Sequence, residues 1–283
     1  MQKPLLGALA ALLLGSASAL AGAVPAQAAV PVRSTVAPAA TVSFAGTVAL
    51  SDCSGSVVRM PDSVATDPAL VLTNGHCLET GMPDPGQVIT DQPSSRSFTL
   101  LSASGGRLGT LRASKVVYAT MTNTDVTLYQ LTSSYAAIQQ RYGISPLTIS
   151  PDHPTVGEPI EVVSGYWRTT YSCGIDGFVY QLHEANWVWD DSVRYTSTCD
   201  TVAGTSGSPV IDTNTGLLVA VNNTGNEDGE SCTLDNPCEV DQDGNVTVHR
   251  GTNYAEETYL LPACFAPGNQ LDLTLPGCTL PTP

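Results

Sequence analysis

Short β-prone runs separated by turn residues recur along the chain from Ser43 onward. In the first half these runs are Gly46–Leu50, Gly55–Arg59, Ala69–Thr73, Ser97–Ser102, Ser114–Ala119 and Asp125–Leu131. In the second half they are Glu158–Ser164, Gly177–Leu182, Trp187–Trp189, Ser208–Ile211, Leu217–Asn222 and Tyr254–Leu260. Short runs at this spacing favour an antiparallel barrel or sandwich. The sequence therefore predicts an all-β protein.

One stretch between the two halves has the pattern of a helix. Ser133–Arg141 begins with a serine that can cap it, either Ser133 or Ser134, and Gly143 follows as a helix terminator. Its position predicts a linker between two β-rich units. The chain has 283 residues, which is enough for one large domain or two small ones.

The charge balance excludes one class of partner. The formal net charge is −15, and lysine occurs only at Lys3 and Lys115. A surface this acidic repels the phosphate backbone, so nucleic-acid binding is not expected.

Residues 1–29 have the pattern of a secretory signal peptide. Lys3 supplies a positive charge, Leu5–Leu14 is an apolar run, and Ala26–Ala28 offers a small-residue cleavage site. A membrane anchor is the alternative, but the run is short and broken by Gly and Ser. We expect a secreted, extracellular protein without a membrane span, in which residues 30–43 are an N-terminal extension or pro-segment.

Eight cysteines fit export. An even number of cysteines outside the cell predicts disulfides, and the chain has no CxxC pair or HxxxH motif to suggest zinc. Eight cysteines allow 105 pairings, and the sequence does not choose among them. Short loops are easy to close, which favours Cys173–Cys199, Cys232–Cys238 and Cys264–Cys278.

Three short stretches carry the residue types of nucleophilic catalysis. Residues 70–77 read L-V-L-T-N-G-H-C, residues 123–131 read N-T-D-V-T-L-Y-Q-L, and residues 204–210 read G-T-S-G-S-P-V. They present His76, Asp125 and Ser206 in that order, separated by 49 and 81 residues. A serine hydroxyl needs a base such as imidazole to take its proton, and the imidazole needs an acceptor to fix its tautomer. The three stretches together therefore predict a catalytic triad.

These motifs resemble those of the chymotrypsin-like serine proteases. T-N-G-H-C resembles T-A-A-H-C, D-V-T-L-Y-Q-L resembles D-I-A-L-x-x-L, and G-T-S-G-S-P resembles G-D-S-G-G-P and the G-N-S-G-S-P of bacterial glutamyl endopeptidases. The likeness covers residues 44–262. It implies two antiparallel six-stranded β-barrels with the active site in the cleft between them. On this basis we expect a first barrel at 44–132, a linker with a short helix at 133–147, a second barrel at 148–265 and a C-terminal tail at 266–283.

The resemblance also assigns roles to individual residues. It implies an oxyanion hole from the N–H groups of Gly204 and Ser206, and a disulfide between Cys53 and Cys77 beside the histidine. Thr205 stands where the family has the aspartate of its zymogen switch. A threonine cannot form that salt bridge, so activation by this route is not expected.

Residues before and after the serine bear on substrate preference. Asp200 lies six residues before Ser206, the offset of the aspartate that gives trypsin its preference for Arg or Lys, and residues 226–245 carry seven acidic side chains. Small or aliphatic residues are the alternative preference. Thr201 matches a pocket threonine of glutamyl endopeptidases, whereas Asn222 replaces their histidine and argues against glutamate.

The sequence predicts no cofactor and assigns no metal ligands. Asp241–Asn245 is either part of a calcium loop or a solvated acidic turn. His153, His183 and His249 have no motif around them. We expect a monomeric endopeptidase acting on proteins or peptides, with a catalytically silent homologue that serves as a secreted binding module as the alternative.

Overall fold

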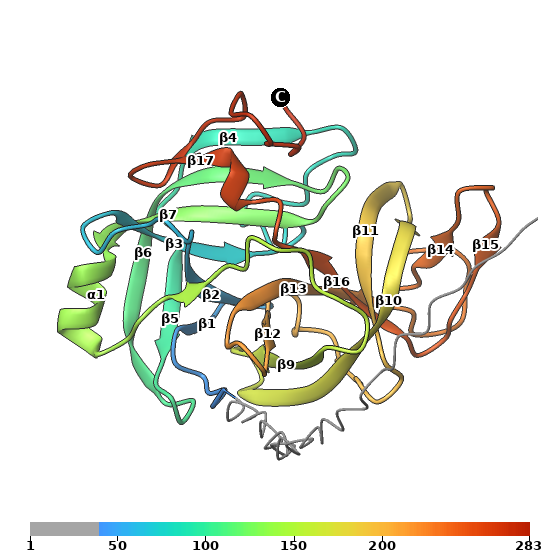
Figure 1. Ribbon diagram of the computed structural model, residues 1–283, viewed down its shortest axis with the longest axis horizontal. Coiled ribbons are helices and arrows are strands. Elements are labelled where there is room, and N and C mark those ends of the chain that lie inside the picture. Colours follow the sequence, from blue (N-terminus) through green and yellow to red (C-terminus); the bar gives the residue numbers. More distant parts are fainter. Residues whose placement is uncertain (1–39) are drawn as a thin grey trace, which may run out of the picture. The chain divides into compact units, whose positions relative to one another are not determined.

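The computed structural model describes residues 40–283 (Figure 1). The expected signal peptide, residues 1–29, lies outside the described residues. Residues 30–39 of the expected N-terminal extension lie outside them as well. Within the described part, no helix is both long and apolar enough to cross a membrane.

Six antiparallel strands form the first barrel. They follow the order β1-β5-β6-β7-β3-β2, and pairing between β1 and β2 closes the ring. The six strands are β1 (Thr47–Ala49), β2 (Ser54–Arg59), β3 (Pro68–Thr73), β5 (Ser97–Leu101), β6 (Arg107–Thr120) and β7 (Val126–Ser134). Two further strands attach outside this ring, where β4 (Val88–Pro93) pairs with β6 and β8 (Leu147–Thr148) pairs in parallel with β2.

A second ring of six antiparallel strands follows. Its order is β11-β16-β13-β12-β9-β10, and pairing between β10 and β11 closes it. The strands are β9 (Pro159–Ser164), β10 (Thr169–Glu184), β11 (Trp187–Tyr195), β12 (Pro209–Asp212), β13 (Leu218–Gly225) and β16 (Asn253–Glu257). A hairpin of β14 (Cys238–Val240) and β15 (Val246–Thr247) extends from β10. The expected two six-stranded antiparallel barrels are confirmed.

Strand β3 of the first barrel is apolar on both faces because both faces are covered. One face fills the barrel interior, where Phe98 and Tyr129 pack edge-on with ring centroids 5.2 Å apart. The other face, including Leu70 and Leu72, packs against β13 and the C-terminal tail. This double burial explains why β3 contains the unbroken apolar run A-L-V-L rather than an alternating pattern.

The predicted helix is present as α1 (Tyr135–Tyr142). The Ser134 hydroxyl accepts a hydrogen bond from the N–H of Ala137 at 3.2 Å, which satisfies one of the free donors of the first turn. Gly143 ends the helix in the left-handed conformation, at a φ of 68°.

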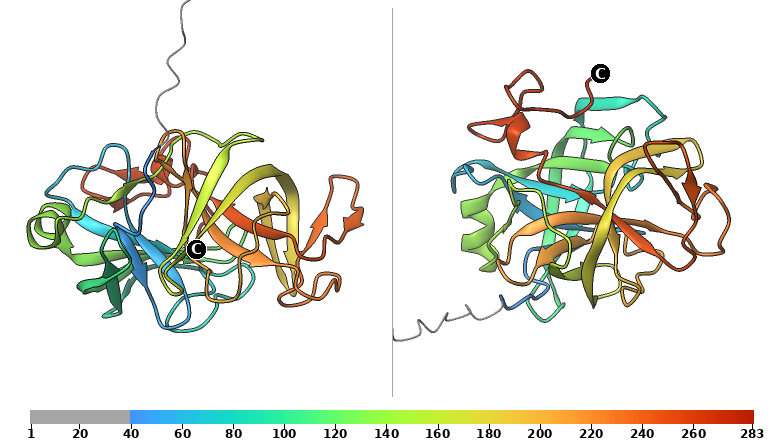
Figure 2. Two further views of the ribbon diagram at one scale, coloured as in Figure 1. Left: turned by 90° about the horizontal axis from the view of Figure 1, so that it is seen from below. Right: turned by 45° about the vertical axis from the view of Figure 1, so that its right-hand side comes forward.

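The C-terminal tail returns to the first barrel (Figure 2). It contains the turn η1 (Pro262–Cys264) and a short hairpin of β17 (Phe265–Ala266) and β18 (Gln270–Leu271). Asn269 is buried there and donates to the carbonyl of Pro68 at 2.8 Å, and Tyr118 donates to the carbonyl of Pro281 at 3.0 Å.

All eight cysteines are paired. The bonds join Cys53 to Cys77, Cys173 to Cys199, Cys232 to Cys238 and Cys264 to Cys278, which are the pairs expected from the resemblance and from short loop closure. The first ties the start of β2 to the turn after β3, and the last fastens the tail to itself.

Polar contacts hold the two barrels together. The N–H of Ser54 in β2 donates to the carbonyl of Ser206 at 2.7 Å. Trp189 of β11 is buried and donates its indole N–H to the carbonyl of Met121 at 3.1 Å. The first of these contacts fixes the loop that carries Ser206 against the first barrel.

Candidate active site

The turn after β3 positions His76 through two neighbouring residues. The side-chain amide of Asn74 is fully buried and donates to the main-chain carbonyl of Asp125 at 2.9 Å. A Cβ atom at Gly75 would lie 2.1 Å from the carbonyl oxygen of Thr120, so only glycine allows this close approach. The T-N-G-H-C sequence thus joins the histidine turn to the strand ends beside it.

His76 and Asp125 form a two-point contact. Asp125, which is fully buried, accepts the backbone N–H of His76 on Oδ1 at 3.0 Å. Its Oδ2 lies 2.7 Å from Nδ1 of the same histidine. A carboxylate can only accept here, so Nδ1 carries the proton and Nε2 keeps its lone pair when the ring is neutral.

Charges around the ring alter the basicity of His76. Burial lowers its pKa, but the charge and hydrogen bond of Asp125, with the charges of Glu184 and Asp235, outweigh burial. The net result is a pKa above the ordinary value of 6.5. His76 is therefore a stronger base than a free imidazole.

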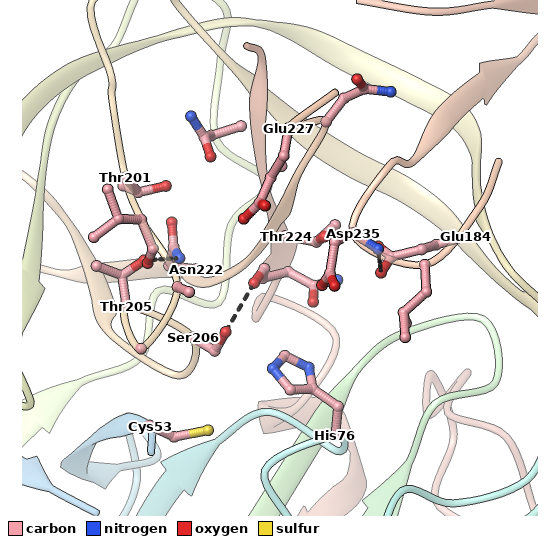
Figure 3. Close-up of a pocket in the computed structure, with 18 of the residues that line it drawn as sticks. Cys53, His76, Glu184, Thr201, Thr205, Ser206, Asn222, Thr224, Glu227 and Asp235 are labelled. Atoms are coloured by element: carbon pink, nitrogen blue, oxygen red, sulfur yellow. Dashed lines mark hydrogen bonds between the residues drawn. The ribbon is translucent and has the colours of Figure 1, made fainter. Parts of the chain in front are cut away.

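Ser206 lies in the loop before β12 and faces the same pocket as His76 (Figure 3). Gly207 adopts a φ of 79°, and a Cβ atom there would lie 2.1 Å from the carbonyl of Ser54, so glycine is needed for the turn. The Ser206 hydroxyl donates to the carbonyl of Asn223 at 3.2 Å, and no hydrogen bond links it to His76 within residues 40–283. Rotation about one single bond redirects this hydroxyl, and such hydrogen bonds are often unformed before substrate binds.

The expected oxyanion donors have no competing acceptor. Among the described residues, neither the N–H of Gly204 nor that of Ser206 donates a hydrogen bond to the protein. Thr205 between them is buried, where its hydroxyl donates to the carbonyl of Val202 and accepts from the side-chain amide of Asn222. Neutral hydrogen bonds thus hold this loop where the family resemblance would place an ion pair.

A pocket of about 590 Å³ surrounds these residues. Its lining includes Asp200, Thr201 and Asn222, the three residues expected at the substrate pocket. Thr201 and Asn222 are buried, but Asp200 is exposed. The pocket therefore contains Asp200 at its surface, not as a buried charge at its base.

Four further carboxylates line the pocket, and no Lys or Arg from the described part of the chain does. They are Asp52, Glu184, Glu227 and Asp235. Glu184, at the end of β10, is buried, and burial raises its pKa. The sequence offered no motif around Glu184, because its place beside the pocket depends on where the β10–β11 hairpin folds.

A further buried carboxylate lies close to Asp125 of the candidate triad. Glu256 of β16 is buried, and its Oε1 accepts from the Ser192 hydroxyl at 3.0 Å and from the Asn223 side-chain amide at 2.9 Å. Burial, with the nearby charge of Asp125, raises the pKa of Glu256 to about 8. Two adjacent glutamates inside a β-prone run are the sequence signal that could have identified this group.

In the acidic loop at residues 241–245, the Asp241 carboxylate accepts hydrogen bonds from other residues of the same loop. Asp241 accepts the N–H groups of Asp243 and Asn245 and the side-chain amide of Asn245, all at 2.8–2.9 Å. These hydrogen bonds close an exposed turn, and both alternatives for this segment, a calcium loop and a solvated acidic turn, stay predictions.

The family of trypsin-like peptidase domains matches residues 53–221. No curated protein matches the chain.

Solved structures similar to the chain include three proteases. The active form of the Rv3671c protease from M. tuberculosis is 16% identical, with 84% of this chain and 82% of that chain covered and a TM-score of 0.45. The MamO protease domain from Magnetospirillum magneticum is 13% identical over 75% of this chain and 91% of that chain, also with a TM-score of 0.45. A Glu endopeptidase is 14% identical over 76% and 85% of the two chains, with a TM-score of 0.42.

The family match spans more than half of the chain and includes the positions of His76, Asp125 and Ser206. The chain therefore belongs to the family of trypsin-like peptidase domains, which are serine proteases.

Proposed function

We propose that the protein is a serine endopeptidase in which Ser206 is the nucleophile, His76 the general base and acid, and Asp125 the group that orients His76. The observation that carries this proposal is the 2.7 Å contact between His76 Nδ1 and Asp125 Oδ2, with Ser206 on the same pocket. That contact leaves Nε2 as the ring's acceptor, on the side needed to receive a serine proton.

The chemistry then follows from these groups. His76 takes the proton of Ser206 as the hydroxyl attacks the carbonyl carbon of a peptide bond. The N–H groups of Gly204 and Ser206 stabilise the resulting oxyanion. His76 then gives its proton to the leaving amine, and an acyl-enzyme on Ser206 remains. In the second half of the reaction, water loses a proton to His76 and attacks the acyl group, and His76 returns that proton to the Ser206 oxygen as the acid leaves.

Replacement of the nucleophile tests the proposal. Ser206→Ala should lower kcat by at least ~10⁴-fold while the circular dichroism spectrum stays that of the wild type, because no other group at the site can attack. The wild type should be labelled by a fluorophosphonate probe and the variant should not. A wild type that neither reacts with the probe nor cleaves peptides would indicate the catalytically silent binding module instead.

The pocket charges support a preference for basic substrates. Five carboxylates line the pocket and, among residues 40–283, no Lys or Arg does, so Arg or Lys before the scissile bond would find a complementary field. Since Asp200 is exposed, its charge is solvated, and the buried Glu184 adds to the same field. We propose Arg or Lys at this substrate position, with small or aliphatic residues as the alternative.

Export is part of the proposal. Residues 1–29 have the pattern of a signal peptide, and all eight cysteines are in disulfides, which form in oxidising compartments. Edman sequencing of the protein recovered from the medium of an expressing culture should begin after residue 28 or later. A cell-retained protein with residue 1 intact would contradict export.

A further inference from the structure

A histidine and two carboxylates converge on the second barrel, outside the pocket. Nε2 of His153, in the loop before β9, lies 3.1 Å from Oδ2 of Asp191 in β11 and 3.1 Å from Oε1 of Glu257 at the end of β16. All three candidate ligand atoms lie within 4.8 Å of one another. None of the three residues lines the pocket that contains Ser206.

Glu257 supplies an observation independent of this clustering. Its side chain is only 3% exposed, and neither of its carboxylate oxygens has a hydrogen-bond partner within the described chain. Although Oε1 lies 3.1 Å from His153, the contact lacks hydrogen-bond geometry. A buried carboxylate without a partner is costly, so a cation at this point would satisfy a group that the protein leaves unsatisfied.

The imidazole of His153 is oriented as in a metal ligand. Its Nδ1 lies 2.6 Å from the carbonyl oxygen of Pro154, and because a carbonyl can only accept, Nδ1 carries the hydrogen. The Nε2 lone pair of the neutral ring then points toward the two carboxylates. Metal-binding histidines usually donate their second ring N–H in this way, which fixes tautomer and orientation.

Neighbouring side chains hold this arrangement. The Tyr259 hydroxyl donates to Oδ2 of Asp191 at 3.3 Å. The rings of Phe178 and Tyr259 pack against the His153 ring, with centroids 4.5 Å and 4.9 Å away. Two of the ligand side chains remain open to solvent, at 38% exposure for His153 and 44% for Asp191, so an ion can enter.

We propose that His153, Asp191 and Glu257 bind one Zn²⁺ ion, with water as the fourth ligand. Ligand atoms about 2.1 Å from a tetrahedral ion lie roughly 3.4 Å apart, close to the two separations of 3.1 Å. One imidazole nitrogen with two carboxylates suits Zn²⁺, whereas Ca²⁺ and Mg²⁺ prefer ligand sets of oxygen alone. Burial and the charge of Asp191 raise the pKa of Glu257 to about 10, so Zn²⁺ would bind by displacing the proton of that carboxyl.

The ion has a structural role. It links the loop before β9 to the paired strands β11 and β16, which lie side by side in Figure 1. Successive side chains of a strand point to opposite faces, so Glu257 faces the ion while Glu256 faces Asn223 beside Ser206. Zn²⁺ should therefore stabilise the second barrel without taking part in peptide hydrolysis.

Calorimetry with ZnCl₂ tests the proposal on the untagged full chain, first stripped of metal with a chelator. We expect one Zn²⁺ per chain by calorimetry and by metal analysis after dialysis, together with a higher Tm and an unchanged kcat. Glu257→Gln and Asp191→Asn should each weaken binding at least 10-fold, since each removes a charged ligand. His249→Gln is the matched control, because His249 lies 3.7 Å from a single carboxylate, and it should bind as the wild type does.

Three results would overturn the assignment. They are a folded wild type that binds no Zn²⁺, unchanged affinity in Asp191→Asn, and tighter binding of CaCl₂ than of ZnCl₂. Because Asp191 is exposed, Asp191→Asn keeps the test decisive even if the buried Glu257→Gln variant does not fold.

Discussion

Replacing Asp125 by asparagine isolates the role of one buried carboxylate with little change in shape. Both oxygens of Asp125 are engaged, one by the backbone N–H of His76 and one by Nδ1 of its ring. An asparagine offers one oxygen and one NH₂ group, so it can satisfy only one of the two. If the oxygen keeps the backbone N–H, the NH₂ group faces Nδ1 and forces the hydrogen of the neutral ring onto Nε2.

The size of the effect follows from that tautomer. An imidazole protonated on Nε2 cannot accept the proton of Ser206, so the variant retains only binding and oxyanion stabilisation. A wrong tautomer of this kind lowers kcat by about 10⁴-fold, or about 5.5 kcal/mol at 1.36 kcal/mol per decade. The opposite amide orientation instead leaves the buried backbone N–H of His76 facing another donor, at about 1–3 kcal/mol of stability.

The assay is steady-state cleavage of a fluorogenic peptide, with circular dichroism and thermal unfolding as checks on folding. Asp67→Asn is the matched control, because Asp67 is a buried aspartate that does not line the pocket, and its kcat should stay within about 3-fold of the wild type. A folded Asp125→Asn protein with kcat within about 10-fold of the wild type would refute the assignment of Asp125.

Three further predictions concern pH, substrate and stability. The rate should increase with pH through an ionisation above 6.5, because His76 must be neutral to act as a base and its pKa is raised. Glu184→Gln should move this ionisation to lower pH in kcat/KM profiles, because the charge of Glu184 helps to raise the pKa of His76. On matched peptides, Arg should be cleaved faster than Ala before the scissile bond, and Asp200→Asn should reduce the ratio; equal wild-type rates would contradict this. Replacing Cys264 and Cys278 by alanine should lower the free energy of unfolding in urea by about 3 kcal/mol, because the unfolded chain then gains the freedom of an open 14-residue loop. An unchanged urea midpoint of unfolding would disprove this.

Local sequence signals predicted much of the fold because they report local geometry. Ser134 and Gly143 delimit α1 through hydrogen bonds and a backbone angle that depend on adjacent residues alone. The strand runs likewise match observed strands, since β-branched residues and turn residues act over a few positions. The short strands β14 and β15, in and directly after the acidic segment, carried no such signal.

Contacts between segments that are distant in the sequence could not be predicted from it. Asp200 has the right offset from Ser206, yet the loop leaves it exposed, because the side-chain direction is set by the fold around the Cys173–Cys199 bond. Glu184 reaches the pocket only because β10 and β11 form a long hairpin beside it. His153 and Glu257 are more than one hundred residues apart and meet through closure of the second barrel.

Contacts of the C-terminal tail also determine whether a chain cut once in the linker would separate into two fragments. Asn269 is hydrogen-bonded to Pro68, and Leu280 packs with Leu70, so the last segment of the chain covers the outer face of the first barrel. A chain cut once between α1 and β8 would therefore keep its two fragments associated, each supplying part of the other's hydrophobic interior. Separating the fragments would expose the apolar cluster that includes Leu70, Leu218 and Leu280, which makes the nicked molecule a non-covalent two-chain protein.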